Sequence, residues 1–550
     1  MATGIPTFRL EVTEGMIDVD TSADRLFGYC IEATKGPIME PTFVASSAEA
    51  KRIFGKSFAP HFYQKPTGLV ITRVGFDGMT KPSLTYQAFP MKKETVDGQQ
   101  VTSVNTNGTP FDVIKIEGVT EGTVSYTIDI SRSWASTTSY NLSIIIDDIT
   151  SKTYQGLADL KSIERVINSK FSNYITATIL ATDEQLENFN RDQLITRERE
   201  EDFNMTVSDK LTGGSNGYLK KTDGTQSNVP INTDGTVPAS SGEGNAQTTL
   251  MIAYRKAFNK MKDVDLLGIA TLSDQKIVQN ELVLHINEVT DPEVAQLRFG
   301  ITGYLDYKEN TEAATPVLID TSAIYEAAEK INNEYIIYIG QGVIFEEDGV
   351  QRKLYPHECV QLYTGIRSAL GYSEAIFGGE QKKVLIGVKD VLPVVTNIDP
   401  ITKEMIVDLN KHGVCTFKKE YGEVTFVEGV TTTQENDVLS YESIMSIVVY
   451  VTKRLIRVAK PYQGQNLNED LKSTLTTALS NELNSIVQTD GTLVALEDYN
   501  IPPYDVSVKS AAVTAFNEAG ELVRESKIII QCKIVPIGAL RDIDLGVIVI

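Results

Sequence analysis

Residues 322–340, SAIYEAAEKINNEYIIYIG, decide the fold of the central part of the chain, because a helical pattern leads directly into an apolar strand. Apolar residues recur at helical spacing over residues 322–333, and EYIIYIG is a continuous run rich in branched aliphatics. Residues 249–271, TLMIAYRKAFNKMKDVDLLGIAT, repeat this order, and residues 356–371 add another helical pattern. Continuous apolar strands between amphipathic helices predict an α/β sheet that is covered on both faces. We therefore expect the main core between residue 249 and about residue 400.

The size and charge of the chain limit its class. A chain of 550 residues is several times the usual domain size of roughly 100–200 residues, so we expect three or four domains. It carries 51 Lys and Arg against 73 Asp and Glu, a formal net charge of −22. Because an anionic surface repels phosphate groups and anionic lipids, nucleic acid and membrane surfaces are poor candidate partners.

The cysteines and the apolar runs indicate where the chain folds. The four cysteines lie far apart and form no C-x-x-C pair: Cys30, Cys359, Cys415 and Cys532. Neither a secretory signal nor an apolar run of 18 residues is present. We expect reduced, buried thiols in a protein that folds in a cytoplasm.

Residues 84–207 differ in character from the central part. Short alternating segments rich in Thr and Ser predict strands, and GLADLKSIERVINSKF, residues 156–171, predicts a helix. This segment carries 18 acidic against 11 basic residues, which indicates a solvated domain that faces outward. A polar, turn-rich loop follows over residues 211–245, and a loop of that length is either functional or disordered.

The last third of the chain predicts two helices followed by a β-hairpin. Residues 441–460 are apolar on nearly every face and predict a buried helix, and the next helix places Asn468 at its N-cap. Residues 504–516 and 522–538 alternate as two strands of a hairpin. Strand patterns also occur at both ends of the chain, in TFRLEVT at residues 7–13 and DIDLGVIVI at residues 542–550.

The chain offers few candidates for chemistry. GGSNG at residues 213–217 matches the G-x-S-x-G hydrolase elbow at Ser215, but polar residues precede it where the elbow needs a buried strand. HECVQ begins like a zinc-binding H-E-x-x-H helix, but Gln361 replaces the second ligand, so His357 and Glu358 are expected to be polar residues at a helix start. We find neither a Walker loop nor a recurring ligand spacing, so no catalytic residue, metal or cofactor is predicted, and the pattern favours a structural protein.

Taken in order, several segments resemble the contractile tail sheath proteins of bacteriophages and contractile injection systems. HECVQLYTGIRSALGYSEAIFGG is similar to the helix and loop that cross the sheath core, and VTKRLIRVAKPYQGQNLNEDLKSTLTTALSNEL to the helix pair of the C-terminal sheath domain. IIIQCKIVPIGALRDIDLGVIVI is similar to the closing strand and C-terminal arm. Upstream, GYCIEATKGPIMEPTFVASSAEAKRIFG is similar to the core entry and KLTGGSNG to the lead into the α/β domain.

The resemblance implies a multidomain fold that combines α/β and α+β parts. It implies an N-terminal arm (1–22), an α/β sheath core (23–83 and 208–400), an inserted β-rich outer domain (84–207), a tube-facing α+β C-terminal domain (401–540) and a C-terminal arm (541–550). The core is often labelled subtilisin-like in this family, but no Asp, His and Ser set is recoverable from this sequence, so the label implies no protease.

The resemblance also implies an assembly mechanism. Sheath subunits stack as hexameric rings on a tail tube, and strands from the arms of neighbouring subunits join a small sheet in each C-terminal domain. The inter-subunit strand residues would be Phe8, Leu10, Val12, Leu545, Val547, Ile548, Val549 and Ile550. Implied partners are other copies of this chain, the tail tube protein, and baseplate and tail terminator proteins, in a virion tail assembled in the bacterial cytoplasm. Two other functions stay open: an α/β hydrolase with Ser215 as nucleophile, and a β-rich receptor-binding or adhesin protein.

Overall fold

A computed structural model describes most of the chain. It describes residues 7–11 and 25–537, with gaps at 124–125, 133–138, 147–149, 187–188, 190–193, 196–207, 212–214, 233–235, 241–243, 292–295, 307–320, 378–382, 393–407, 435–437, 463–467, 497–499 and 517–521. No helix among these residues is long and apolar enough to cross a membrane.

A seven-stranded sheet forms the centre of the molecule, in the order β25-β21-β20-β19-β2-β4-β3. Its strands are β2 (Phe27–Ile31), β3 (Thr42–Val44), β4 (Leu69–Arg73), β19 (Gly268–Thr271), β20 (Phe299–Gly303), β21 (Ile336–Ile339) and β25 (Val414–Cys415). All neighbours run parallel except β3, which is antiparallel to β4. The sheet therefore joins strands from before and after the inserted segment, and it takes in β25 from the segment expected to belong to the C-terminal domain.

Helices cover both faces of this sheet, as the sequence predicts. They are α1 (Ser47–Phe54), α2 (Ala59–Tyr63), α5 (Ala246–Lys260), α6 (Lys276–Val289), α7 (Thr321–Glu329) and α8 (Val360–Ala369). Successive strand residues point to opposite faces, so Ile336 packs in the cluster with α5 and α6 while Ile337 packs in the cluster with α8. Each helix buries an apolar face against continuous apolar strands, which is the physical reason for the two-sided covering.

The inserted segment forms a β domain with its own hydrophobic core. Two four-stranded sheets face each other, β12-β11-β10-β15 and β13-β9-β6-β14. Their strands are β6 (Ser83–Ala88), β9 (Phe111–Gly118), β10 (Tyr126–Arg132), β11 (Tyr140–Ile146), β12 (Thr150–Leu157), β13 (Ile175–Ile179), β14 (Leu194–Ile195) and β15 (Ser208–Lys210). Two helices, α3 (Leu160–Lys170) and α4 (Asp183–Leu186), complete the domain, and a separate hairpin, β7 (Met91–Val96) and β8 (Gln99–Val104), extends from it.

The described part of the polar loop is ordered. β16 (Ser215–Asn216) pairs with β5 (Met79–Thr80), and β17 (Tyr218–Lys220) pairs with β18 (Gln226–Pro230). Asn216 is buried, and its Nδ2 donates to the backbone oxygen of Asn232 at 2.7 Å and to Thr123 Oγ1 at 3.1 Å. The loop therefore fixes the junction between the central sheet and the inserted domain.

The remaining elements complete the central and C-terminal parts. They are β22 (Val343–Glu347), β23 (Val350–Leu354), β24 (Val388–Val391), β26 (Phe417–Glu420), β27 (Glu423–Phe426), α10 (Glu442–Ala459), α11 (Glu469–Ser485), β28 (Tyr504–Phe516), β29 (Leu522–Ile534), the 3-10 turns Val438–Ser440 and Lys460–Tyr462, and the π-helical turn Ile486–Asp490. One continuous hydrophobic cluster runs from Phe27 in the central sheet to Ile534 in β29. The C-terminal helices and the central sheet therefore share a core.

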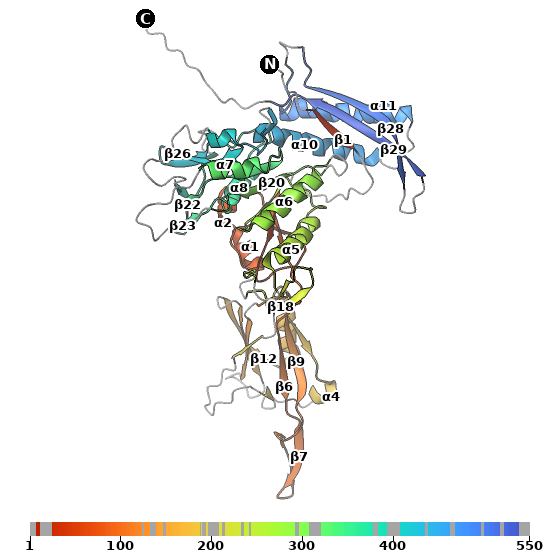
Figure 1. Cartoon of the computed structure of the whole chain (residues 1–550). Coiled ribbons are helices and arrows are strands. Elements are labelled where there is room, and N and C mark those ends of the chain that lie inside the picture. Colours follow the sequence, from red (N-terminus) through yellow and green to blue (C-terminus); the bar gives the residue numbers. More distant parts are fainter. Residues whose placement is uncertain are drawn as a thin grey trace.

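The described parts of the molecule form an elongated arrangement of three tiers (Figure 1). β28, β29, α10 and α11 lie at one end, the α/β sheet and its helices lie in the middle, and the β domain with the β7–β8 hairpin lies at the other end. The mixed α/β multidomain architecture expected from the sequence is confirmed.

Candidate assembly site

The β28–β29 hairpin is the largest feature at the C-terminal end of the molecule. Its two strands pair antiparallel over 13 residues each, with Tyr504 opposite Ile534 and Phe516 opposite Leu522. The alternating pattern of the sequence accounts for this, because branched and small residues recur at every second position over residues 506–514 and 528–534. The predicted hairpin is confirmed.

One face of the hairpin packs on the body of the molecule near its open end. Ile530, Cys532 and Ile534 are buried, while Gln531 and Lys533 between them are exposed. A shift of one residue in register would turn the apolar set to solvent, so burial of this face fixes the pairing of β29.

Helix α11 forms the surface on which the hairpin packs. Asn468 is its N-cap, and the Asn468 Oδ1 atom accepts a hydrogen bond from the Leu471 backbone N–H at 2.7 Å, as the sequence predicts. The helix buries a stripe of four leucines: Leu471, Leu475, Leu479 and Leu483. The Tyr504 hydroxyl donates to the Ser480 backbone oxygen at 3.2 Å, which joins the first residue of β28 to this helix.

Helix α10 connects this platform to the central core. It is buried along most of its length, as its all-round apolar sequence predicts. At its first turn, Arg367 Nη1 of α8 lies 3.4 Å from Glu442 Oε1, and both side chains are fully buried. Burial raises the pKa of Glu442, and the charge of Arg367 acts in the opposite direction.

A second ionic contact fixes α10 from the other side. Lys453 Nζ donates to Asp265 Oδ1 and to the Leu266 backbone oxygen, each at 2.6 Å, just before β19. Arg454 pairs with Glu482 of α11, so α10 is bonded both to the central sheet and to the helix under the hairpin. The β28–β29 hairpin therefore rests on helices that are bonded to the central core.

The N-terminal strand adds to this hairpin. β1 (Thr7–Glu11) pairs antiparallel with β29, with Phe8 opposite Cys532 and Leu10 opposite Ile530. The three strands form one sheet in the order β1-β29-β28, here called the assembly sheet. The strand expected at residues 7–13 is present over residues 7–11, and in this single chain it joins the chain's own sheet, while residues 12–13 lie outside the described residues. Val12 and all five predicted C-terminal arm residues, Leu545, Val547, Ile548, Val549 and Ile550, lie outside the described residues.

The opposite edge of the assembly sheet is open within the described part of the chain. β28 pairs with β29 on one side, and no described strand pairs with its other side. A 13-residue edge strand presents a row of backbone N–H and C=O groups that can pair with another strand. The site can therefore accept an extended segment by backbone hydrogen bonding, with no chemistry on any side chain.

The thiols are buried, as expected, and are unsuited to chemistry. All four cysteines are free and buried. Burial raises the pKa of Cys415 and of Cys532 to about 12, and it raises the pKa of Cys30 and Cys359 as well. Because the thiolate is the reactive form, these side chains behave as small apolar residues of the core.

The structure does not build a nucleophile elbow at Ser215. This residue lies in the two-residue strand β16, and another short strand, β17, follows it where the elbow would need a helix. The Ser215 hydroxyl oxygen accepts a hydrogen bond from the Gly217 backbone N–H at 3.0 Å. The arrangement is an ordinary turn between short strands.

The H-E-C-V-Q segment begins a helix, as predicted. Glu358 Oε2 accepts a hydrogen bond from the Tyr355 backbone N–H at 3.0 Å, and the His357 ring stacks on the Tyr355 ring. The desolvation of His357 lowers its pKa. Among the described residues no group of three or more His, Cys, Asp and Glu side chains could hold a metal ion.

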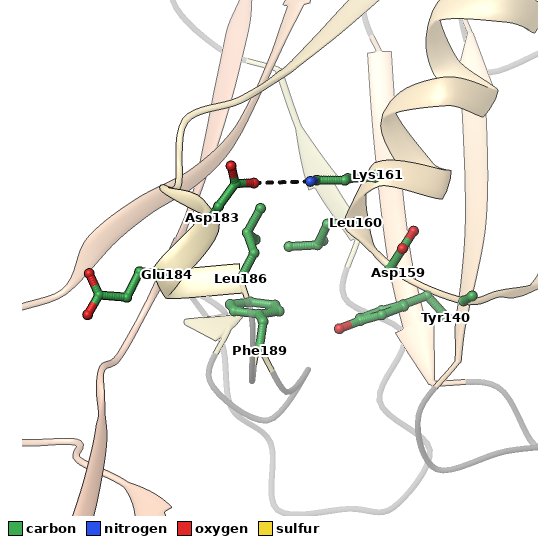
Figure 2. Close-up of a pocket in the computed structure, with 9 residues that line it drawn as sticks. Tyr140, Asp159, Leu160, Lys161, Asp183, Glu184, Leu186 and Phe189 are labelled. Atoms are coloured by element: carbon green, nitrogen blue, oxygen red, sulfur yellow. Dashed lines mark hydrogen bonds and ion pairs between the residues drawn. The ribbon is translucent and has the colours of Figure 1, made fainter.

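The inserted domain contains a pocket of about 670 Å³ between the start of α3 and α4 (Figure 2). The rings of Tyr140 and Phe189 line one part of it, and Lys161 Nζ donates to Asp183 Oδ1 at 3.1 Å in another. Asp159 is the N-cap of α3, and its hydrogen bond from the Ser162 hydroxyl lowers its pKa. Two of the three carboxylates in the lining thus already have partners, and Ser215 is not part of this pocket.

The assembly sheet was only partly visible in the sequence. The hairpin and the strand at residues 7–13 could be recognised from alternation, but their pairing with each other could not. The ion pair between Arg367 and Glu442 joins residues 75 positions apart, and no local pattern marks buried charges. The sequence offers one signal for this contact: α10 is apolar on nearly every face but carries one Glu in its first turn.

Comparisons with known proteins agree with a sheath fold. No family model matches the chain, and no curated protein matches its sequence. Among solved structures, the sheath tail protein from Desulfitobacterium hafniense matches with a TM-score of 0.55 and 11% identity, over 94% of this chain and 99% of that protein. The sheath tail protein from Listeria innocua matches with a TM-score of 0.52 and 11% identity, over 93% of this chain and 96% of that protein. At this identity the likeness concerns the fold, and it extends over nearly the whole of each chain.

Proposed function

We propose that this chain, which has the fold of tail sheath proteins, is the structural subunit of a contractile tail sheath. In this proposal the subunits form hexameric rings around a tail tube and contract to drive the tube through the host cell envelope. The observation that carries the proposal is the assembly sheet, with a terminal strand on one edge and an open 13-residue strand on the other. The fold likeness to two sheath tail proteins supports it over nearly the whole chain.

The assembly sheet suits exchange of strands between subunits. β1 is joined to the body through residues 12–24, so the same five residues could pair with β29 of another copy in the same register. The open edge of β28 would accept the C-terminal arm, residues 541–550, whose sequence is a strand of branched aliphatics. Phe8 and Leu10 in β1 and the five arm residues would then be inter-subunit contacts.

Contraction would be a rearrangement of rigid bodies linked by these strands. The ion pairs of α10 hold the assembly sheet to the central core, so a subunit would turn as a unit while its arms act as tethers. No fuel is needed if the extended sheath is a metastable state that relaxes to a lattice with more contact between subunits. A few kcal/mol per interface, on the order of ordinary protein interfaces, would sum to hundreds over a tail.

The expected partners follow from this role. They are other copies of the chain, a tail tube protein facing the C-terminal domain, and baseplate and terminator proteins at the two ends of the sheath. The particle would be a virion tail assembled in the host cytoplasm. The net charge of −22 argues against direct contact with nucleic acid.

Negative-stain electron microscopy of the purified chain tests the proposal. Striated hollow tubes or stacked rings are expected from a sheath subunit. Compact trimers without tubes would instead support the adhesin alternative, in which the inserted domain would be the receptor-binding part. The hydrolase alternative has little structural support, because Ser215 lacks the strand and helix of a nucleophile elbow.

A further inference from the structure

Three hairpins in the described part of the chain have the same kind of two-residue turn, and one of these turns contains an unusual residue. Both turn residues have positive φ in each case: Asp97 and Gly98, Asp348 and Gly349, and Tyr421 and Gly422. Such turns favour Asn-Gly or Asp-Gly, because Asn and Asp tolerate positive φ better than other side chains. Two hairpins follow this preference. The third has a bulky aromatic residue at φ 53°, which is a strained conformation for that side chain.

Within the described part of the chain, no packing compensates for this choice. The Tyr421 side chain has a relative exposure of 104%, so it packs against no described part of its own subunit. Glu420 and Glu423 lie directly opposite each other at the turn, and Lys418 Nζ, 3.0 Å from Glu420 Oε2, offsets part of their repulsion. The Tyr421 backbone conformation is therefore locally unfavourable for the isolated subunit, and strained conformations of this kind cluster at functional sites.

Two more exposed apolar side chains lie on neighbouring elements. Val350, next to the turn of the β22–β23 hairpin, is 69% exposed, and Ile386, just before β24, is 44% exposed. Gln64 holds the Ile386 backbone in place, accepting from its N–H at 3.1 Å and donating to its oxygen at 3.0 Å. The Ile386 side chain is thus held outward by a fixed backbone.

The elements that carry these side chains form one rigid unit. β24 pairs with β22, and Lys419 Nζ of β26 donates to Asp390 Oδ2 of β24 at 3.0 Å. In Figure 1, β22, β23 and β26 lie on the same side of the central tier, away from the β28–β29 hairpin. Tyr421, Val350 and Ile386, with the strands that carry them, are here called the hairpin surface.

The hairpin surface is nearly neutral, although the chain is strongly acidic. Residues 343–354, 386–391 and 417–426 together contain six acidic and five basic side chains, against 73 and 51 in the whole chain. Many of these charges are paired with each other, among them Lys389 with Glu346 and Arg352 with Glu347. A neutral surface with exposed apolar tips can approach another acidic molecule without charge repulsion.

We infer that the hairpin surface is a second contact between copies of this chain, with Tyr421 as its anchor. The proposed partner is another copy of the chain. Every subunit of a homopolymer carries the same acidic surface, and a nearly neutral patch can contact that surface without adding further negative charge. Exposed aromatic residues are the usual anchors of such contacts. The inference rests on the proposed polymerisation, but it concerns a surface remote from the assembly sheet.

The test compares Tyr421→Asn with the unmodified chain. Asn suits the turn, so the thermal unfolding midpoint of the subunit should stay the same or rise, measured on depolymerised protein. The same substitution should raise the critical concentration for polymerisation at least tenfold, measured by sedimentation and electron microscopy. Tyr421→Phe keeps the aromatic ring. Its critical concentration for polymerisation should therefore stay within about threefold of that of the unmodified chain, well below the tenfold increase expected for Tyr421→Asn. Val96→Thr, at the exposed tip of the β7–β8 hairpin, is the matched control and should polymerise normally.

Each outcome decides the inference. If the unmodified chain and Tyr421→Asn polymerise equally, the hairpin surface is not a subunit contact, while the sheath proposal stands. If Tyr421→Asn loses thermal stability together with polymerisation, Tyr421 has a structural role and the inference is wrong. If only binding to isolated tail tube protein is lost, the partner is the tube and not another copy. If the unmodified chain forms no polymer, the sheath proposal fails and the inference fails with it.

Discussion

Removing residues 1–11 should abolish polymerisation while leaving the subunit folded. This deletion removes β1, which covers the edge of β29 over residues Ile529–Lys533. The remaining hairpin keeps its full pairing with β28 and its contact with α11. We therefore expect a soluble subunit whose secondary structure differs from that of the intact chain by little more than one short strand.

The expected change in stability follows from two opposing terms. Five residues of β1 lie in register with β29, and hydrogen bonds at about 1 kcal/mol each give the ladder about 5 kcal/mol. Ordering the backbone of five residues costs about 1–2 kcal/mol each, or about 5–10 kcal/mol in all. The backbone contribution of β1 is therefore close to zero or unfavourable within one chain. On these backbone terms alone, deletion should not lower the free energy of unfolding, and the change should lie between zero and a gain of about 5 kcal/mol.

Chemical denaturation followed by circular dichroism and negative-stain microscopy together test this expectation. Deletion of residues 1–6 is the matched control, because it shortens the same terminus but leaves β1 intact. The control should polymerise normally, and the longer deletion should give single subunits. Normal tubes from the longer deletion would refute the role of β1 in assembly. A loss of more than about 3 kcal/mol of unfolding free energy, as for a lost buried interaction, would show that β1 is a structural part of each subunit.

Other changes probe the remaining features. Deletion of residues 541–550 should leave a folded, soluble subunit that forms neither rings nor tubes by microscopy, and normal polymerisation would contradict the proposed C-terminal arm. Glu442→Gln leaves Arg367 buried without its carboxylate and should lower the free energy of unfolding by about 3–5 kcal/mol, while the double change Glu442→Leu with Arg367→Met should cost less. Burial acts to raise the pKa of Asp265, but Lys453 and Arg457 hold the pKa below its usual value. The charged Asp265 carboxylate therefore stabilises the folded chain at pH values above its unfolded pKa of about 3.9. This stabilisation is lost as the pH falls through the lower pKa of the folded state. The Asp265→Asn variant should lack this part of the pH dependence of the free energy of unfolding. Ser215→Ala should alter neither polymerisation nor the hydrolysis of activated esters, and a loss of hydrolysis would favour the hydrolase alternative.

Local sequence patterns predict the elements of this protein well. The four buried leucines of α11 recur at a spacing of one helical turn, and Asn468 stands where the first turn needs an acceptor. Alternation fixes the two strands of the hairpin, because their inward positions carry apolar side chains such as Ile530 and Ile534. These features depend on residues a few positions apart, and the sequence displays them directly.

Contacts between distant residues could not be predicted in the same way. β25 joins the central sheet beside β21, from a segment that the order of motifs assigned to the C-terminal domain. The two-residue length of β25 gives no periodic signal. Its place is set by burial of Cys415 in the shared core and of Val414 in a separate cluster with α7. The sequence does not mark Tyr421 either, because its significance depends on a turn conformation and on full exposure, neither of which a sequence reveals.

The pairing of β1 within its own chain and its proposed role between chains are compatible. Residues 12–24 connect β1 to the body, and thirteen residues can span at most roughly 45 Å when fully extended. That reach exceeds the width of a small domain, about 30 Å, so in the proposed ring β1 would be long enough on its tether to reach a copy packed alongside. In a lone subunit, β1 can pair only with its own β29. In the proposed ring, every neighbour would present an identical β29 edge, and β1 would pair with it in the same five-residue register. Exchange therefore needs no new recognition, and the near-zero backbone stability of β1 within one chain makes the strand easy to release.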